Sequence, residues 1–134
     1  MTVISGSCVC GKVEFTVKDK FLYAGYCHCS LCRKSSGASG TAIGGLVKQD
    51  FSVTKGLENI KSFKRSEQTE SCFCDNCGST LYGEKPETGL VHVRYGALDA
   101  SPSLLPQAHM HVASKADWYE ITDNLPQFSE FPKQ

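Results

Sequence analysis

The chain has 134 residues, of which 40% are hydrophobic and 21% are charged, a composition typical of one globular domain with a buried core. Lysine plus arginine and aspartate plus glutamate both number 14. The chain therefore lacks the basic excess of most nucleic-acid-binding proteins, and we expect no nucleic-acid partner.

The N-terminal segment MTVISGSCVCGKVEF has neither a basic start nor an apolar run. No stretch elsewhere approaches the roughly 18 apolar residues of a membrane-spanning helix. These features predict a cytoplasmic protein without a signal peptide or a membrane segment. In that reducing compartment, the eight cysteines indicate metal ligands rather than disulfides. Disulfides within C-x-C pairs would also be strained.

The segment GSCVCGKVEFTVK predicts a β-hairpin. Apolar residues alternate along its second half with the period of a half-buried strand, at Val13, Phe15 and Val17. Cys8 and Cys10 lie near the tip of this hairpin. Residues i and i+2 of an extended segment face the same way, so both sulfurs can reach one ion.

Further strands are expected at residues 60–64, 80–82 and 90–95, and the segment 30–36 predicts one short helical turn. Gly44 and Gly45 indicate a bend in a sheet. Four of the five prolines follow Ala97, so this tail should wrap over the sheet rather than form long helices. The chain is thus predicted to be mainly β, as one domain over residues 1–134.

The cysteines divide into two groups by their spacing. Cys74, Cys77 and the following Gly78 have the form of a zinc knuckle, which supplies two ligands and requires a second pair. Cys8 and Cys10 are the available pair. A structural zinc site would then connect the first hairpin to the middle of the chain and contribute directly to folding.

Cys27, Cys29 and Cys32 remain as three ligands within six residues. A loop this short covers one side of an ion, so the fourth position is left for water, for a substrate thiol, or for Cys72. We favour a buried free thiol for Cys72. Three thiolates and Zn²⁺ carry a net charge of −1, which weakens the Lewis acidity of the ion but suits a soft sulfur ligand. The open site therefore favours a thiol or thioether substrate.

Basic residues near this triplet are further candidates. Arg33 and Lys34 follow Cys32 directly, where they could attract a substrate carboxylate or could lie in a solvated turn. His28 should face away from the metal and form hydrogen bonds. His109 and His111 alternate on one side of a possible strand, where they are expected in a pocket wall or in ordinary packing, with proton transfer as the alternative. In a pocket wall, His109 would be a substrate-binding residue.

The segments SGSCVCGKVEF, CHCSLCRKSSG, FCDNCGSTLY, GLVHVRYGALD and HMHVASKADWYEITDNLPQF resemble, in this order, the glutathione-dependent formaldehyde-activating enzyme family. The resemblance implies a small zinc-stabilised β-tent of stacked antiparallel sheets with few helical turns. It also implies two zinc ions per chain, one structural and one open, on the same two groups of cysteines. The implied activity is that of a carbon–sulfur lyase that reversibly condenses formaldehyde with glutathione.

Two alternatives to this enzyme remain. The first is a non-enzymatic zinc-binding or partner-binding module of the same fold, which would be favoured if Cys72 closed the second site. The second is a nucleic-acid-binding zinc ribbon, which the zero net charge disfavours. The sequence leaves the true substrate and the oligomeric state open.

Overall fold

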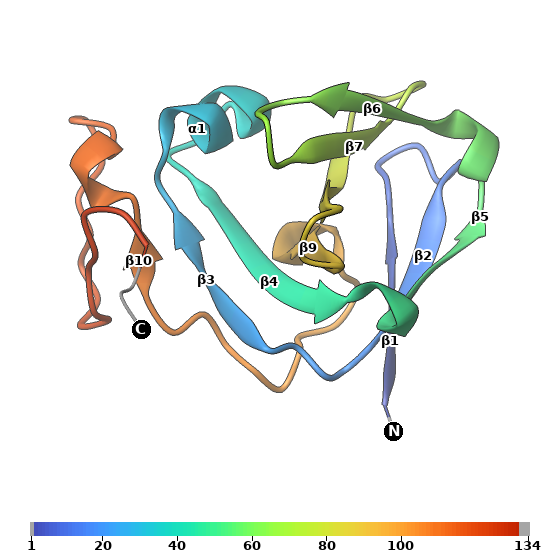
Figure 1. Cartoon of the computed structure of the whole chain (residues 1–134), viewed down its shortest axis with the longest axis horizontal. Helices are drawn as coiled ribbons and strands as arrows, with labels where there is room; N and C mark the ends of the chain where they lie inside the picture. The colour runs from blue at the N-terminus through green and yellow to red at the C-terminus, as the bar shows by residue number, and fades with distance from the viewer. Residues whose placement is uncertain (1, 132–134) are drawn as a thin grey trace.

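A computed structural model describes residues 2–131, so Pro132, the last of the tail prolines, lies outside the described residues. Within these described residues, ten strands and one α-helix form the fold (Figure 1). The strands are β1 Val3–Ser7, β2 Glu14–Lys18, β3 Tyr23–Cys27, β4 Thr41–Val47, β5 Phe51–Lys55, β6 Ile60–Lys64, β7 Glu70–Cys74, β8 Thr80–Lys85, β9 Leu90–Arg94 and β10 His109–Met110. The helices are α1 Ser30–Ser36 and four single 3₁₀ turns, η1 Lys48–Asp50, η2 Leu57–Asn59, η3 Tyr95–Ala97 and η4 Val112–Ser114.

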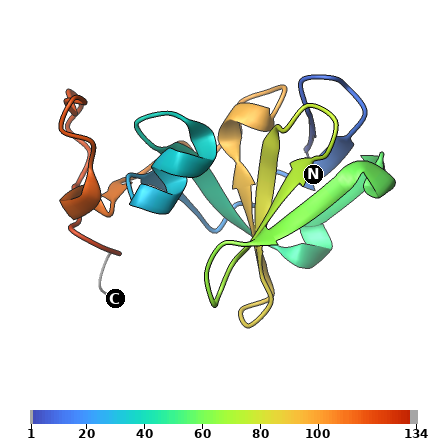
Figure 2. The same ribbon diagram turned by 90° about the horizontal axis from the view of Figure 1, so that it is seen from above.

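Two sheets make up the molecule. The smaller sheet has the order β1-β2-β5, and the larger has the order β10-β3-β4-β9-β8-β7-β6. All the strand pairs are antiparallel except the short pair of β10 with β3, which is parallel. Figure 2 shows that the strands of the larger sheet do not lie in one plane. The predicted mainly β fold of antiparallel sheets is confirmed.

The predicted elements agree closely with the observed ones. The helical turn and β6 have the expected bounds, and β8 and β9 begin at Thr80 and Leu90 as expected. Cys29 caps the N-terminus of helix α1, where its sulfur accepts a hydrogen bond from the Cys32 amide. Gly37 caps the C-terminus and has the left-handed conformation (φ 67°) common after helices.

One hydrophobic core joins the two sheets. Side chains of β1 and β2 pack there against side chains of β4, β8 and β9, and the members buried to 4% exposure or less include Ile4, Phe15, Val17, Leu46, Leu81 and Val93. Cys8 and Cys74 belong to the same cluster. The first group of cysteines therefore lies at the margin of the core, where the two sheets meet.

The tail passes along the edge of the larger sheet, as predicted. The His109 amide donates to Pro126 O at 2.8 Å, and the Phe128 amide donates to His109 O at 2.9 Å. Figure 1 shows this segment beside β10, at the opposite end of the molecule from β5. Strand β10 ends at Met110 because His111 has a left-handed backbone (φ 55°). His109 and His111 thus do not share a strand face, and that expectation is wrong.

Gly44 and Gly45 lie in the middle of β4, which pairs with β3 and β9 through both glycines without a register shift. A Cβ on Gly44 would lie 2.5 Å from Tyr95 Cε1 and 2.6 Å from Phe21 Cδ1. The two glycines therefore leave room for aromatic rings on the surface of β4, rather than marking the predicted bend.

We expect Gly44→Ala to lower the free energy of unfolding by about 1–3 kcal/mol, because the added methyl group overpacks the Phe21 and Tyr95 rings. Gly96→Ala is the matched control, since nothing lies within 4 Å of its Cβ position. Urea unfolding of both variants measures the difference. Equal stability of the two variants would show that the rings move aside without cost.

Candidate metal centres and their surroundings

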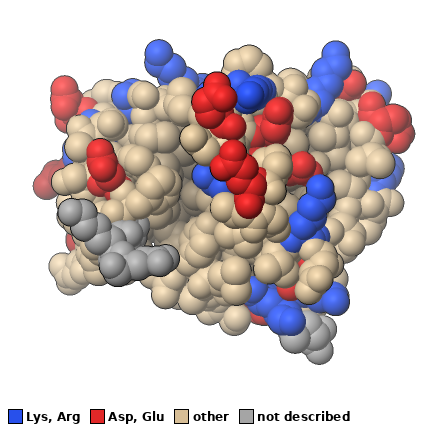
Figure 3. All heavy atoms as spheres, viewed as in Figure 1, with Lys and Arg blue, Asp and Glu red and all other residues tan. Residues whose placement is uncertain are grey.

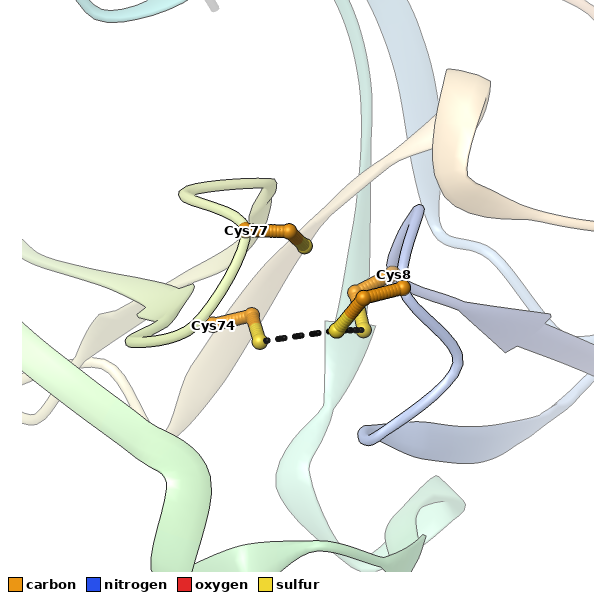
Figure 4. A group of neighbouring side chains, drawn as sticks. Cys8, Cys74 and Cys77 are labelled. Atoms are coloured by element: carbon orange, nitrogen blue, oxygen red, sulfur yellow. Dashed lines mark hydrogen bonds between the residues drawn. The ribbon is translucent and has the colours of Figure 1, made fainter.

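The first cysteine cluster brings together two loops that are far apart in the sequence. The sulfurs of Cys8, Cys10, Cys74 and Cys77 all lie within 4.8 Å of one another. Cys10 Sγ is 3.6 Å from Cys8 Sγ and 3.8 Å from Cys74 Sγ. Four sulfurs around a tetrahedral zinc ion with bonds of about 2.3 Å would be about 3.8 Å apart. The geometry fits such an ion, and Figure 4 shows Cys8, Cys74 and Cys77 directed toward one another.

Backbone hydrogen bonds fix both loops of this cluster. The Val13 amide donates to Cys8 Sγ at 3.3 Å, and the Gly78 amide donates to Cys74 O at 2.8 Å. Gly78 has φ 79°, which glycine adopts without a steric penalty. A hydrogen bond with the Ser79 hydroxyl lowers the pKa of the Cys77 thiol to about 5, which favours the thiolate that a metal binds.

The second cluster contains three sulfurs from one short segment. Cys27 ends β3, Cys29 precedes α1, and Cys32 lies in its first turn, with their sulfurs within 4.8 Å of one another. Cys27 and Cys32 are buried, and Cys29 is half-buried. Among residues 2–131, no fourth cysteine, histidine or carboxylate joins this group. The cluster can hold an ion and leave one coordination position unfilled by the protein.

Cys72 belongs to neither cluster. Its side chain is 4% exposed on β7, and its sulfur faces Glu70 O at 3.9 Å. Burial raises the pKa of the Cys72 thiol to about 11. These contacts agree with the predicted buried free thiol.

Basic side chains surround the three-sulfur cluster, and they come from β8, β9 and the loop after β6 rather than from the segment after Cys32. Arg65 Nη1 donates to Cys32 Sγ at 3.5 Å. Arg94 of β9 is 9% exposed, and burial lowers its pKa. Burial also lowers the pKa of Lys85 and, to about 4, that of His92. The negative charge of three thiolates stabilises this concentration of positive charge.

The sequence analysis missed these four basic residues. His92 and Arg94 occupy alternate positions in LVHVR, and this pattern was interpreted only as evidence of a strand. Arg33 and Lys34 instead lie in the last turn of α1, where positive charge complements the helix dipole. Lys34 is exposed and Arg33 half-buried, and the cation that contacts Cys32 is Arg65.

A chain of hydrogen bonds leads from the three-sulfur segment to the surface. His28 Nε2 is 2.8 Å from His109 Nδ1, and His109 Nε2 is 2.9 Å from Asp123 Oδ2. Both histidines are 2% exposed, and the hydrogen bond from His109 lowers the pKa of Asp123. His28 is therefore a hydrogen-bonding residue, as expected. His109 binds other side chains rather than lining a described pocket.

Two cavities border the cluster from different sides. A cleft of about 500 Å³ lies between the two cysteine clusters and is lined by serine and threonine hydroxyls and by Arg94. A more apolar pocket of about 660 Å³ includes Ile43, His92, Met110 and Phe128. Ile43 and Met110 also pack against Cys27 and Cys32, so this pocket adjoins the cluster.

Charges of both signs alternate over the face shown in Figure 3. Within residues 2–131, no helix is long and apolar enough to cross a membrane.

Known proteins that are similar to this chain share the name of one enzyme family. A family model described as glutathione-dependent formaldehyde-activating enzyme matches residues 3–114. A Halomonas elongata protein whose name assigns it to this family is 33% identical over 127 residues, covering 89% of this chain and 81% of the relative. A Fusarium vanettenii protein with the same family name is 29% identical over 128 residues, and the match spans 92% of this chain but only 58% of the relative.

A solved structure of a Rhodobacter sphaeroides protein has the same fold. It superposes with a TM-score of 0.59 at 24% identity, covering 74% of this chain and 91% of the other.

We expect Cys72 to react with iodoacetamide at pH 7.5 at least about 100-fold more slowly than an exposed thiol, because its raised pKa and its burial both limit the thiolate. The reference is the thiol introduced by Ser62→Cys, at the exposed position that pairs with Cys72 on β6. Mass spectrometry of time points gives both rates. Comparable rates would contradict the placement of Cys72 in the core.

Proposed function

Since the chain belongs to the glutathione-dependent formaldehyde-activating enzyme family, we propose that it reversibly condenses formaldehyde with glutathione to S-hydroxymethylglutathione, as a carbon–sulfur lyase. The observation that carries this proposal is the cluster of Cys27, Cys29 and Cys32, which has three sulfurs and no fourth protein ligand among the described residues. A closed four-sulfur cluster would bind a metal without room for a substrate.

We propose two zinc ions per chain. The structural ion would be held by Cys8, Cys10, Cys74 and Cys77, and the open ion by Cys27, Cys29 and Cys32. Both donor sets are soft thiolates in a compact arrangement, which fits zinc. An ion at the open cluster would supply a coordination position that accepts the glutathione sulfur and favours its thiolate form.

Groups around the open cluster contact the sulfurs at which the proposed reaction would take place. The glutathione thiol releases its proton to water, its sulfur forms a bond to the formaldehyde carbon, and the carbon–oxygen π pair moves to oxygen. That oxygen then takes a proton from water, so no net proton is gained or lost. The reverse reaction breaks the same carbon–sulfur bond. Arg65 donates a hydrogen bond to Cys32 Sγ, which favours the thiolate of that residue. The Cys32 amide donates to Cys29 Sγ and fixes its position at the start of the helix. Arg33, Lys34 and His109 stay tentative substrate-binding residues.

The non-enzymatic alternative would be favoured if Cys72 closed the second cluster or if the chain bound a single metal ion. The direction of the Cys72 sulfur toward Glu70 O gives this alternative no support. We further propose that residues 1–134 act as one domain, because the core combines both sheets. A cytoplasmic location fits the eight unpaired cysteines, seven of which lie in the two clusters.

Metal analysis tests the division of the cysteines. We expect two zinc ions per chain in the wild type and in Cys72→Ser, and one in Cys29→Ser, which should keep its fold. Cys74→Ser should unfold or lose most of its stability, because it removes a buried ligand that joins the two sheets. Elemental analysis and circular dichroism give both quantities. One zinc ion in the wild type, or a loss of zinc in Cys72→Ser, would refute the division.

The activity is measured by exchange spectroscopy of ¹³C-formaldehyde with glutathione, which separates catalysed from spontaneous adduct formation. We expect zinc-replete protein to accelerate the exchange and Cys29→Ser to reduce this acceleration at least about 100-fold, because the open cluster loses a ligand. Cys72→Ser is the control and should match the wild type. Exchange at the spontaneous rate with fully zinc-loaded protein would reject the proposed reaction.

A further inference from the structure

Arg94 is a buried cation without an acidic partner in the part of the chain described. Its side chain is enclosed between β9 and α1, and its one side-chain hydrogen bond is from Nη2 to Ser35 Oγ at 3.4 Å. The ion pairs among residues 2–131 all involve other side chains. Burial of a guanidinium without a counter-charge is costly, so this position is suited to an anion.

Arg65 contacts a sulfur of the three-cysteine cluster, whereas Arg94 makes no such contact. Three thiolates with one divalent ion carry a charge of −1, and Arg65 lies against Cys32 Sγ, where it balances that charge. Arg94 borders the same small cavity beside Cys32, but it makes no hydrogen bond with a sulfur. With Lys85 also near the cluster, the cations exceed its charge of −1, and the site retains positive charge that a ligand can neutralise.

The cleft next to Arg94 has the size and the chemistry of a site for a small polar molecule. Its volume of about 500 Å³ lies within the usual range for ligand pockets. Hydroxyl groups line it, from Ser7, Ser35, Ser36, Thr41, Ser79 and Thr80. The Thr41 hydroxyl is fully buried and lies beside Cys32, so it is not itself open to the cleft. Such a wall can donate to and accept from the amide groups of a peptide-like ligand.

Residues that line the cleft are neighbours of the three cluster cysteines in the fold. Ser35 and Ser36 follow Cys32 by three and four residues on α1, so they lie about one helical turn from it, roughly 5–6 Å between Cβ atoms. Thr41 pairs with Cys27 across β3 and β4. Arg94 borders both the cleft and the cavity beside Cys32.

We propose that this cleft binds a carboxylate of the thiol substrate, with the Arg94 guanidinium as its anchor and the surrounding hydroxyls as hydrogen-bonding partners. The preferred substrates are then thiols that carry a carboxylate several bonds from the sulfur. This inference rests on the proposed function for the identity of the thiol. The carboxylate site itself depends only on Arg94 and the cleft.

Titrations of cobalt-substituted protein test this proposal. The probes are glutathione, glutathione diethyl ester, in which both carboxylates are blocked, and neutral 2-mercaptoethanol. We expect the wild type to bind glutathione at least about 10-fold more tightly than the diester, as a charge-assisted hydrogen bond would give. Arg94→Gln should remove this preference while binding 2-mercaptoethanol as the wild type does. Lys61→Gln, which removes an exposed positive charge on β6, should retain the preference.

Other outcomes would overturn the proposal. Equal affinity of the wild type for glutathione and its diester is one, and this comparison holds even if Arg94→Gln fails to fold. A second is that Arg94→Gln loses metal and loses affinity for 2-mercaptoethanol as much as for glutathione. That result would assign Arg94 to the cysteine cluster alone.

S-methylglutathione separates this inference from the proposed function, because it has both carboxylates and no free thiol. Calorimetric binding of S-methylglutathione that depends on Arg94 supports the carboxylate site even where no thiol changes the cobalt spectrum. In that case the proposed reaction fails and the site remains. Binding of S-methylglutathione that is unchanged in Arg94→Gln would reject the site.

Discussion

The structure depends on the close approach of thiol sulfurs at two points. In the first cluster, neighbouring sulfurs are 3.6 and 3.8 Å apart, and as thiolates they repel one another unless a cation lies between them. The cluster joins the β1–β2 turn to the turn after β7, which are more than 60 residues apart in the sequence. A metal bound there closes a long loop and fixes the smaller sheet on the larger one. In a domain of this size, such a bond supplements a core of limited volume.

The second cluster differs from the first in what surrounds it. The first has four sulfurs, two of them exposed, and lies beside serine and backbone groups. The second has three sulfurs, and strands β8 and β9 bring Lys85, His92 and Arg94 toward it, joined by Arg65 from the loop after β6. Thiolates and buried cations stabilise each other in this region, and the cleft beside Arg94 gives access from the side of α1. The first cluster thus has the surroundings of a structural metal site, and the second has those of a binding site.

Local patterns in the sequence were sufficient for the first hairpin, for β6, β8 and β9, for the helical turn and for both groups of cysteines. C-x-C and C-x-x-C spacings determine which sulfurs can share an ion, and the alternation in LVHVR identifies β9. The burial of Arg94 could not be predicted this way, because it depends on β4 and α1 packing over a strand that has polar residues on one face. The hydrogen bond of His28 with His109 joins residues 81 positions apart and likewise has no local signal. The left-handed backbone at His111, which ends β10, was also not evident from AHMHVAS.

The central claim is that one of the two ions has an incomplete set of protein ligands. X-ray absorption at the zinc edge measures the mean number of sulfur ligands per ion in fully loaded protein. With four sulfurs at one ion and three at the other, the mean should be about 3.5, and it should rise to about 4 when glutathione is added. A mean of four sulfurs before any thiol is added, or a mean that glutathione leaves unchanged, would contradict the account.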